Sequence, residues 1–123
     1  MSLPLNHMSN HFWRDNVIQP ALNRDVDAAV AEQEAILIKD PHNSQAYFAL
    51  GTLLHFRGAT EQATQHFERS IELDPANVAP HLSLGRLYAV RGDYELAWKH
   101  ARAAEALGAH DLVEMLERYP NLK

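Results

Sequence analysis

The residues of this 123-residue chain that most invite a chemical role are its eight histidines, because imidazole is a common metal ligand. His66 and His100 stand 34 residues apart, on equivalent faces of two predicted helices. Packed helices lie about 8–10 Å apart, which is too far for these two rings to share one ion. The chain has no cysteine and no His-Glu-x-x-His motif. We therefore predict no metal site and interpret the histidines as polar residues on solvated helix faces.

Catalysis finds no support in the residue patterns. The chain has no Gly-x-Ser-x-Gly elbow and no phosphate-binding loop, and the lack of cysteine excludes a thiol nucleophile and a disulfide framework. The acidic pairs Glu32 with Glu34 and Glu114 with Glu117 are typical of solvated helix surfaces. We expect a non-enzymatic protein with no catalytic residues and no cofactor.

The composition of the chain limits which classes of partner it is expected to bind. The formal net charge is −5, from 11 basic and 16 acidic residues, and the basic residues are scattered. Such a balance disfavours binding to nucleic acid. No run of about 18 apolar residues exists, so we expect no membrane span. The absence of cysteine fits a reducing compartment, and a cytoplasmic location is the expectation.

A period of 34 residues organises the chain. Residues recur at this step in five pairs and one series of three: Asp40/Asp74, Pro41/Pro75, Leu50/Leu84, Gly51/Gly85, Gly58/Gly92 and Ala29/Ala63/Ala97. A chain that repeats itself at a fixed step folds by stacking copies of one small unit. Stacked units form binding surfaces more readily than catalytic pockets.

Each unit is predicted to be a pair of helices. In residues 44–77, the first helix covers 45–57 and ends at Gly58, which accepts a left-handed backbone. Thr60 is the expected N-cap of the second helix, and Pro75 ends it. Residues 78–111 repeat this plan, with a stop at Arg91-Gly92 and with Asp93 as the second cap.

The N-terminal unit, 10–43, is irregular. Its second helix is expected over 25–40 and its first over about 10–23. Pro20 falls inside that first helix, where a proline costs about 3 kcal/mol. We expect a kink or a helix end near Gln19.

The C-terminal residues 112–123 are predicted to form a capping helix and a tail. Asp111 with Glu114 resembles a capping box at the start of that helix. Such a helix would cover the apolar end of the stack. Trp98, which has no bulky counterpart in the other units, is expected to pack under it. Residues 1–9 are expected to be a flexible tail or residues added for expression.

The repeated unit resembles the tetratricopeptide repeat family. Residues 44–77 match its pattern at Tyr47, Leu50-Gly51, Ala63, Phe67 and Pro75. The unit 78–111 matches at Leu84-Gly85, Tyr88, Ala97 and Ala104, whereas 10–43 matches only at Trp13, Ala29 and Pro41. Departures occur at Leu54, Ser70 and His81. The resemblance implies an all-α fold, a right-handed superhelical α-solenoid of antiparallel helix pairs with three units, the first of them degenerate.

The resemblance also implies a concave groove, lined by the first helices of successive units, that takes peptides. The groove-facing candidates in this sequence are Arg14, Gln45, Phe48, Thr52, His55, Leu82 and Arg86, with His11, Ile18, Ala79 and Ala89 extending the row. This mixture of apolar and basic groups suits a peptide with an apolar anchor and an acidic group. In the competing interpretation, Phe48 and Leu82 are buried against neighbouring helices and Arg86 is merely solvated.

One subgroup of the family clamps the C-terminal carboxylate of chaperone tails with lysines on first helices. The three lysines here, Lys39, Lys99 and Lys123, lie elsewhere, so this clamp is not expected. The predicted function is a protein–protein interaction scaffold that binds a peptide or helix of another protein. Two alternatives stay open: a self-associating homodimer, joined at the irregular N-terminal end, and a structural segment of a larger array.

Overall fold

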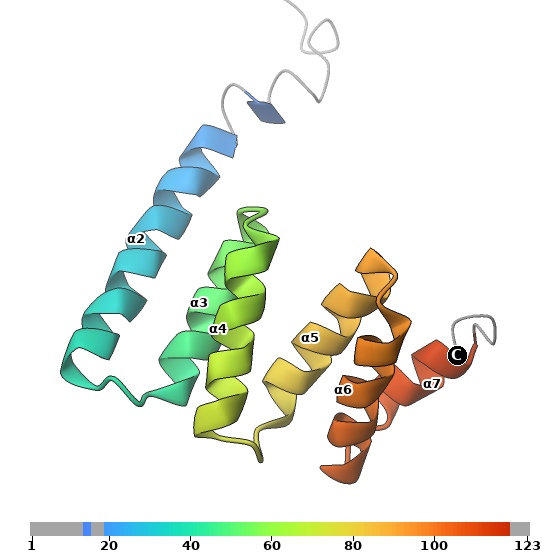
Figure 1. Ribbon diagram of the computed structural model, residues 1–123. Helices are drawn as coiled ribbons and strands as arrows, with labels where there is room; N and C mark the ends of the chain where they lie inside the picture. The colour runs from blue at the N-terminus through green and yellow to red at the C-terminus, as the bar shows by residue number, and fades with distance from the viewer. Residues whose placement is uncertain (1–13, 16–18, 119–123) are drawn as a thin grey trace, which may run out of the picture.

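The helices of this chain follow one another in a row, each packed on its neighbours (Figure 1). The computed structural model describes residues 14–15 and 19–118. Within that part, helices are the regular elements: α2 (Gln19–Lys39), α3 (Ser44–Phe56), α4 (Thr60–Leu73), α5 (Val78–Arg91), α6 (Tyr94–Ala106) and α7 (Asp111–Glu117). None of them, in the described residues, is long and apolar enough to cross a bilayer.

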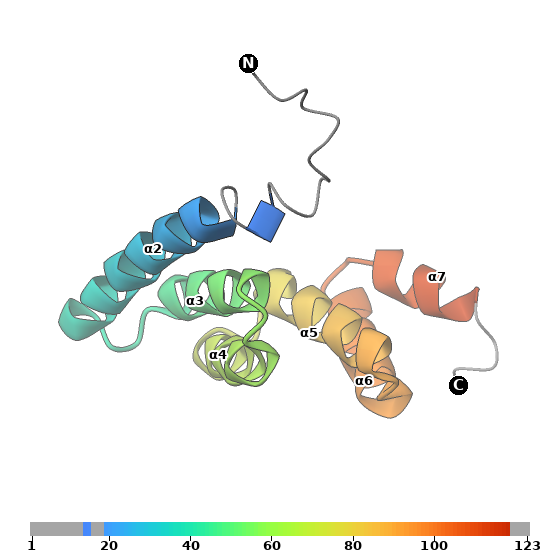
Figure 2. The same ribbon diagram turned by 90° about the horizontal axis from the view of Figure 1, so that it is seen from above.

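The helices pack as sequential antiparallel pairs, which confirms the predicted all-α stack. The closest partners are α3 with α4 and α5 with α6, while α2 packs on α3 and α7 packs on α6 and α5. Figure 2 shows α3 and α5 following one another in a row, with α4 on one side of that row. The α4–α5 contact joins the two central pairs.

Helix starts differ in detail from the sequence prediction. Asn43 and Asn77 cap α3 and α5, and their side chains accept hydrogen bonds from the backbone N–H groups of Ala46 (2.9 Å) and Ala79 (3.1 Å). The expected cap Thr60 is instead the first residue of α4. The capping box expected at Asp111 is also wrong, because His110 holds the N-cap position of α7.

The N-terminal helix begins where an interruption was expected. Helix α2 runs unbroken from Gln19 to Lys39, so the predicted break between helices at 23 and 25 does not occur. Pro20 is the second residue of α2, and its missing N–H costs nothing in the first turn. The rest of the expected first helix lies outside the described residues, apart from residues 14–15, as do His11, Trp13 and Ile18.

A single apolar core runs through α3 to α7. Its most deeply buried members include Ala63, Phe67, Leu84, Ala97 and Leu116, each at most 2% exposed. A smaller, separate cluster of Val26, Val30 and Leu50 holds α2 to α3. Two alanines of the 34-residue series, Ala63 and Ala97, are thus fully buried where helices pack closely, as their small size predicts, whereas Ala29 is only partly buried.

Two glycines allow these close approaches. A Cβ on Gly51 would lie 2.7 Å from the Phe67 ring on α4. A Cβ on Gly85 would collide with Leu112 Cδ2, so α7 sits on α5 only because position 85 lacks a side chain. The predicted role of both glycines in close packing is therefore confirmed. Gly92 has a different role, since its φ of 85° ends α5.

Candidate functional site

A cleft opens between α3 and α5, where the resemblance placed a peptide groove. Its volume is about 260 Å³, and the residues around it are Thr52, His55, Phe67, Ser83, Arg86, Leu87 and Val90. Thr52 and His55 lie one turn apart on α3, and Arg86 and Val90 lie one turn apart on α5. The two helices therefore present their side chains across the cleft from both sides.

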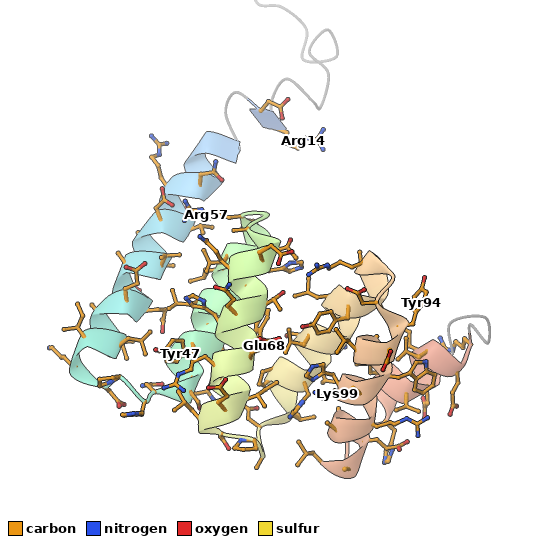
Figure 3. The ribbon with its side chains drawn as sticks, viewed as in Figure 1. Arg14, Tyr47, Arg57, Glu68, Tyr94 and Lys99 are labelled. Atoms are coloured by element: carbon orange, nitrogen blue, oxygen red, sulfur yellow. The ribbon has the colours of Figure 1, made fainter. Side chains whose placement is uncertain are left out.

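Arg86 carries the notable charge of this cleft. Its side chain is exposed and forms no ion pair within the described part of the chain. Other arginines nearby are engaged: Arg57 lies 3.0 Å from Asp27, and Arg91 lies 3.2 Å from Glu61. Figure 3 shows Arg57 near the N-terminal helix, away from α5. Arg86 is thus free to offer its planar donors to a carboxylate.

The structure brings three of the seven candidate residues together. Thr52, His55 and Arg86 line the cleft. Phe48 and Leu82 are half-buried and pack against the main core, with the Phe48 ring 5.7 Å from that of Phe67. For these two residues the competing, structural interpretation is the better one.

The remaining two candidates lie outside the cleft. Gln45 is exposed in the first turn of α3 and is not among the residues that line the cleft. Arg14 is exposed beyond the N-terminal end of α2 (Figure 3), and its Nε lies 3.8 Å from Asp15 Oδ1. Neither residue adds to the surface around Arg86.

Sequence reasoning missed Ser83, Leu87 and Val90. Ser83, Arg86 and Val90 recur at three- and four-residue steps, so they share one face of α5. Val90 is 88% exposed at the rim of the cleft, which is unusual for a large apolar side chain. The helical spacing from Arg86 was the signal that could have identified them.

The histidines require a correction. His81 and His100 are 8% and 9% exposed, and their Nδ1 atoms lie 3.2 Å apart. This distance is that of a hydrogen bond, in which one ring N–H donates and the other ring nitrogen accepts. The interpretation of all histidines as solvated fails for these two. The 34-residue period could not predict this contact. His81 stands where the repeat usually has a bulky aromatic residue, and its partner His100 lies on a different helix.

The histidine pair extends into a polar chain that links two units. The His100 ring stacks on Tyr88 with centroids 5.7 Å apart, and the Tyr88 hydroxyl donates to Glu68 Oε1 on α4 at 2.9 Å. Burial, together with His81 and Lys99, lowers the pKa of His100 to about 4. Burial, assisted by the Glu68 hydrogen bond, raises the pKa of Tyr88 to about 12. Figure 3 shows Glu68 between α4 and α5, where it connects them.

The described residues hold no group of three or more His, Cys, Asp or Glu side chains that could bind a metal ion. The visible contacts of the buried histidine pair are its hydrogen bond and the stacking of His100 on Tyr88.

Comparison with known proteins gives one family match. A family model described as a tetratricopeptide repeat matches residues 66–99. This span begins within α4, includes all of α5 and ends within α6. It therefore crosses the boundary at 77/78 between the two units read from the sequence. The curated proteins yield no match. Residues 66–99 thus match one tetratricopeptide repeat, and proteins with this repeat generally mediate protein–protein interactions.

Proposed function

We propose that this tetratricopeptide-repeat stack binds an extended segment of another protein in the α3–α5 cleft. The observation that carries the proposal is Arg86, an exposed guanidinium without an ion pair in the described residues, set one turn from the exposed Val90. A charged donor beside an apolar surface suits a ligand with a carboxylate next to an apolar side chain. Ser83 and Thr52 add hydroxyl groups at the same cleft.

The size of the cleft favours a peptide over a small metabolite. Sites for small molecules commonly enclose about 300–1,000 Å³, and this cleft has about 260 Å³. It is open along α3 and α5, so one or two side chains of a longer ligand fit in it while the ligand backbone stays outside. The ligand class that we propose is therefore a peptide with an acidic residue beside an aliphatic or aromatic one.

A charge reversal tests the cleft. Arg86→Glu removes the charged donor and repels a carboxylate, so we expect affinity for the bound partner to fall at least about tenfold, or 1.4 kcal/mol. Lys99→Glu is the matched control, because it makes the same change of charge at an exposed residue of α6 that does not line the cleft. Partners are captured from native extract by the unmodified chain and ranked by mass spectrometry.

The captured partners are then compared among the unmodified chain, Arg86→Glu and Lys99→Glu. Segments of these partners are made as synthetic peptides, and calorimetry measures their affinity for each protein. The proposal requires a partner that is lost with Arg86→Glu and retained with Lys99→Glu. Partners that bind both variants equally would show that the α3–α5 cleft is not the binding surface.

Self-association is the second candidate function. It is favoured by exposed apolar side chains at the C-terminal end of α2. Ile36 is 40% and Ile38 is 82% exposed there, in a helix that packs on α3. A second copy that covered these side chains would form a closed dimer. Light scattering decides between the two: a mass near 13.9 kDa at every concentration excludes the dimer. A doubled mass that returns to one chain in Ile38→Lys supports it.

A further inference from the structure

A second and larger cleft lies between α6 and α7, at the C-terminal end of the stack. Its volume is about 890 Å³, within the range of ligand sites. The lining combines the start and outer side of α6 with α7: Gly92, Asp93, Tyr94, Glu95, Leu96, Trp98, Arg102, Glu105, Val113 and Glu117. Figure 3 shows Tyr94 on the side of α6 that faces away from α5. This cleft shares no lining residue with the α3–α5 cleft.

Trp98 gives the cleft an aromatic surface with a cation already on it. The indole is half-buried and packs against the main core. The guanidinium carbon of Arg102 lies 5.3 Å from the centre of the Trp98 ring, within the range of a cation–π contact. Leu96, 39% exposed, supplies apolar surface nearby. The cleft therefore already holds one cation against an aromatic face.

The charge of the lining is negative. Four carboxylates face one cation: Asp93, Glu95, Glu105 and Glu117 against Arg102. Asp93 lies 3.9 Å from Arg91, and Glu105 lies 3.8 Å from His110, both near the outer limit of an ion pair. Glu95 and Glu117 form no ion pair within the described ranges. Two carboxylates thus stay uncompensated beside the aromatic surface.

The simplest explanation of such charge is solubility, because the last unit of a repeat stack needs a polar outer face. That explanation accounts for the carboxylates. It does not require a cleft of this size, nor Tyr94, Leu96 and Trp98 gathered in it. Aromatic faces, a free aliphatic side chain and unpaired carboxylates are together the complement of a basic, partly apolar ligand.

We propose that the α6–α7 cleft binds a basic segment of another protein. Arginine or lysine side chains of that segment pair with Glu95 and Glu117, and an apolar side chain between them packs on Trp98 and Leu96. The assignment of a cationic partner comes from the charge of the lining and from the position of Arg102. It is independent of the acidic ligand proposed for the α3–α5 cleft.

Fluorescence of Trp98 tests this proposal directly. The chain has two tryptophans, so Trp13→Phe leaves Trp98 as the sole reporter. Two blocked peptides serve as probes, acetyl-Arg-Leu-Arg-Leu-amide and its acidic counterpart acetyl-Glu-Leu-Glu-Leu-amide. We expect the basic peptide to change the Trp98 emission with a dissociation constant of about 1 mM or below. The acidic peptide should bind at least about tenfold more weakly, and added salt should weaken the basic one.

Paired variants identify the carboxylates. Glu95→Gln with Glu117→Gln should weaken the basic peptide about tenfold. Glu32→Gln with Glu114→Gln is the matched control, because it removes the same charge from exposed positions on α2 and α7 outside the cleft, and it should leave binding unchanged. Circular dichroism of each variant checks that the helices are intact.

Four results would overturn the proposal. They are no response to the basic peptide, equal binding of both peptides, and equal affinity of the Glu95/Glu117 and control pairs. The fourth is that the basic peptide binds a variant that ends at Arg118 but does not bind the full chain. Residues 119–123 of the chain itself would then occupy the cleft. Sedimentation equilibrium completes the test: a dimer that the basic peptide dissociates would make the occupant a second copy of this chain.

Discussion

The buried pair of His81 and His100 should make the stability of this protein fall between neutral pH and pH 4. The folded state holds the pKa of His100 at about 4, below the value of about 6.5 for an exposed histidine. Between these two values the unfolded chain binds a proton at His100 and the folded chain does not. The slope of unfolding free energy with pH is then positive, so stability is lost as pH falls through that window.

The magnitude follows from the size of the pKa difference. Each unit is worth 1.36 kcal/mol, so a difference of about 2.5 units amounts to about 3 kcal/mol at most. The ring keeps 9% exposure, and solvent screening reduces the figure to about 2–3 kcal/mol. For a chain of this length, that loss corresponds to a decrease in Tm of about 10 °C between pH 7 and pH 4.

Urea unfolding at pH 7, 6, 5 and 4 measures the effect, with His100→Gln as the diagnostic variant. Glutamine keeps a polar group opposite His81 but does not titrate, so the variant should be less stable at pH 7 and should lose about 2 kcal/mol less than the parent on acidification. His66→Gln is the matched control, because it alters the equivalent place one repeat earlier, where the ring is half-exposed. If the parent and His100→Gln lose equal stability between pH 7 and pH 4, the assignment to His100 is wrong.

Two further predictions concern packing. Gly85→Ala places a Cβ against Leu112 Cδ2 and should destabilise the chain by about 1–3 kcal/mol in urea unfolding, chiefly by displacing α7. Ser70→Ala removes the hydrogen bond from the Ser70 hydroxyl to the Ser44 carbonyl, 2.9 Å long between α4 and the start of α3, and should cost about 1 kcal/mol by the same assay.

Each packing variant has a control on its own or a neighbouring helix. Ser83→Ala, at a half-buried position that lines the α3–α5 cleft, should change stability by less than about 0.5 kcal/mol, and a Gly85→Ala value as small as this would contradict the close approach of α7. Thr52→Ala removes a hydroxyl that bonds only to the Phe48 carbonyl of its own helix, at 3.1 Å. If Ser70→Ala costs no more than Thr52→Ala, the α4–α3 hydrogen bond contributes nothing net.

The sequence was most informative where the period of 34 residues encodes packing. The alanine series, Gly51 and Gly85 predicted which helices touch, because small residues at crossings leave few alternatives. Helix ends were predicted where glycine marks them, as at Gly92. Helix starts were less accurate, since the caps Asn43 and Asn77 were not predicted although asparagine is a favoured N-cap residue.

The two candidate clefts were harder to predict than the stack. Arg86 was placed in its cleft by the repeat alone, but Phe48 and Leu82 turned out to contribute to the core, because a groove position and a core position share one helical spacing. The pairing of His81 with His100 joins residues 19 positions apart and depends on how α5 crosses α6. The cleft at Trp98 likewise depends on how α7 packs on α6, which the spacing of residues within one helix does not predict.

The separate cluster of Val26, Val30 and Leu50 divides the molecule into unequal parts. The main core is continuous from α3 to α7, whereas the contacts of α2 with α3 in the described residues include this small cluster and the Arg57–Asp27 ion pair. In a linear array, local opening occurs where the fewest neighbours must separate. We therefore expect α2 to separate from α3 before α3 to α7 unfold, so that its amides exchange with solvent faster and its backbone is cleaved by proteases first.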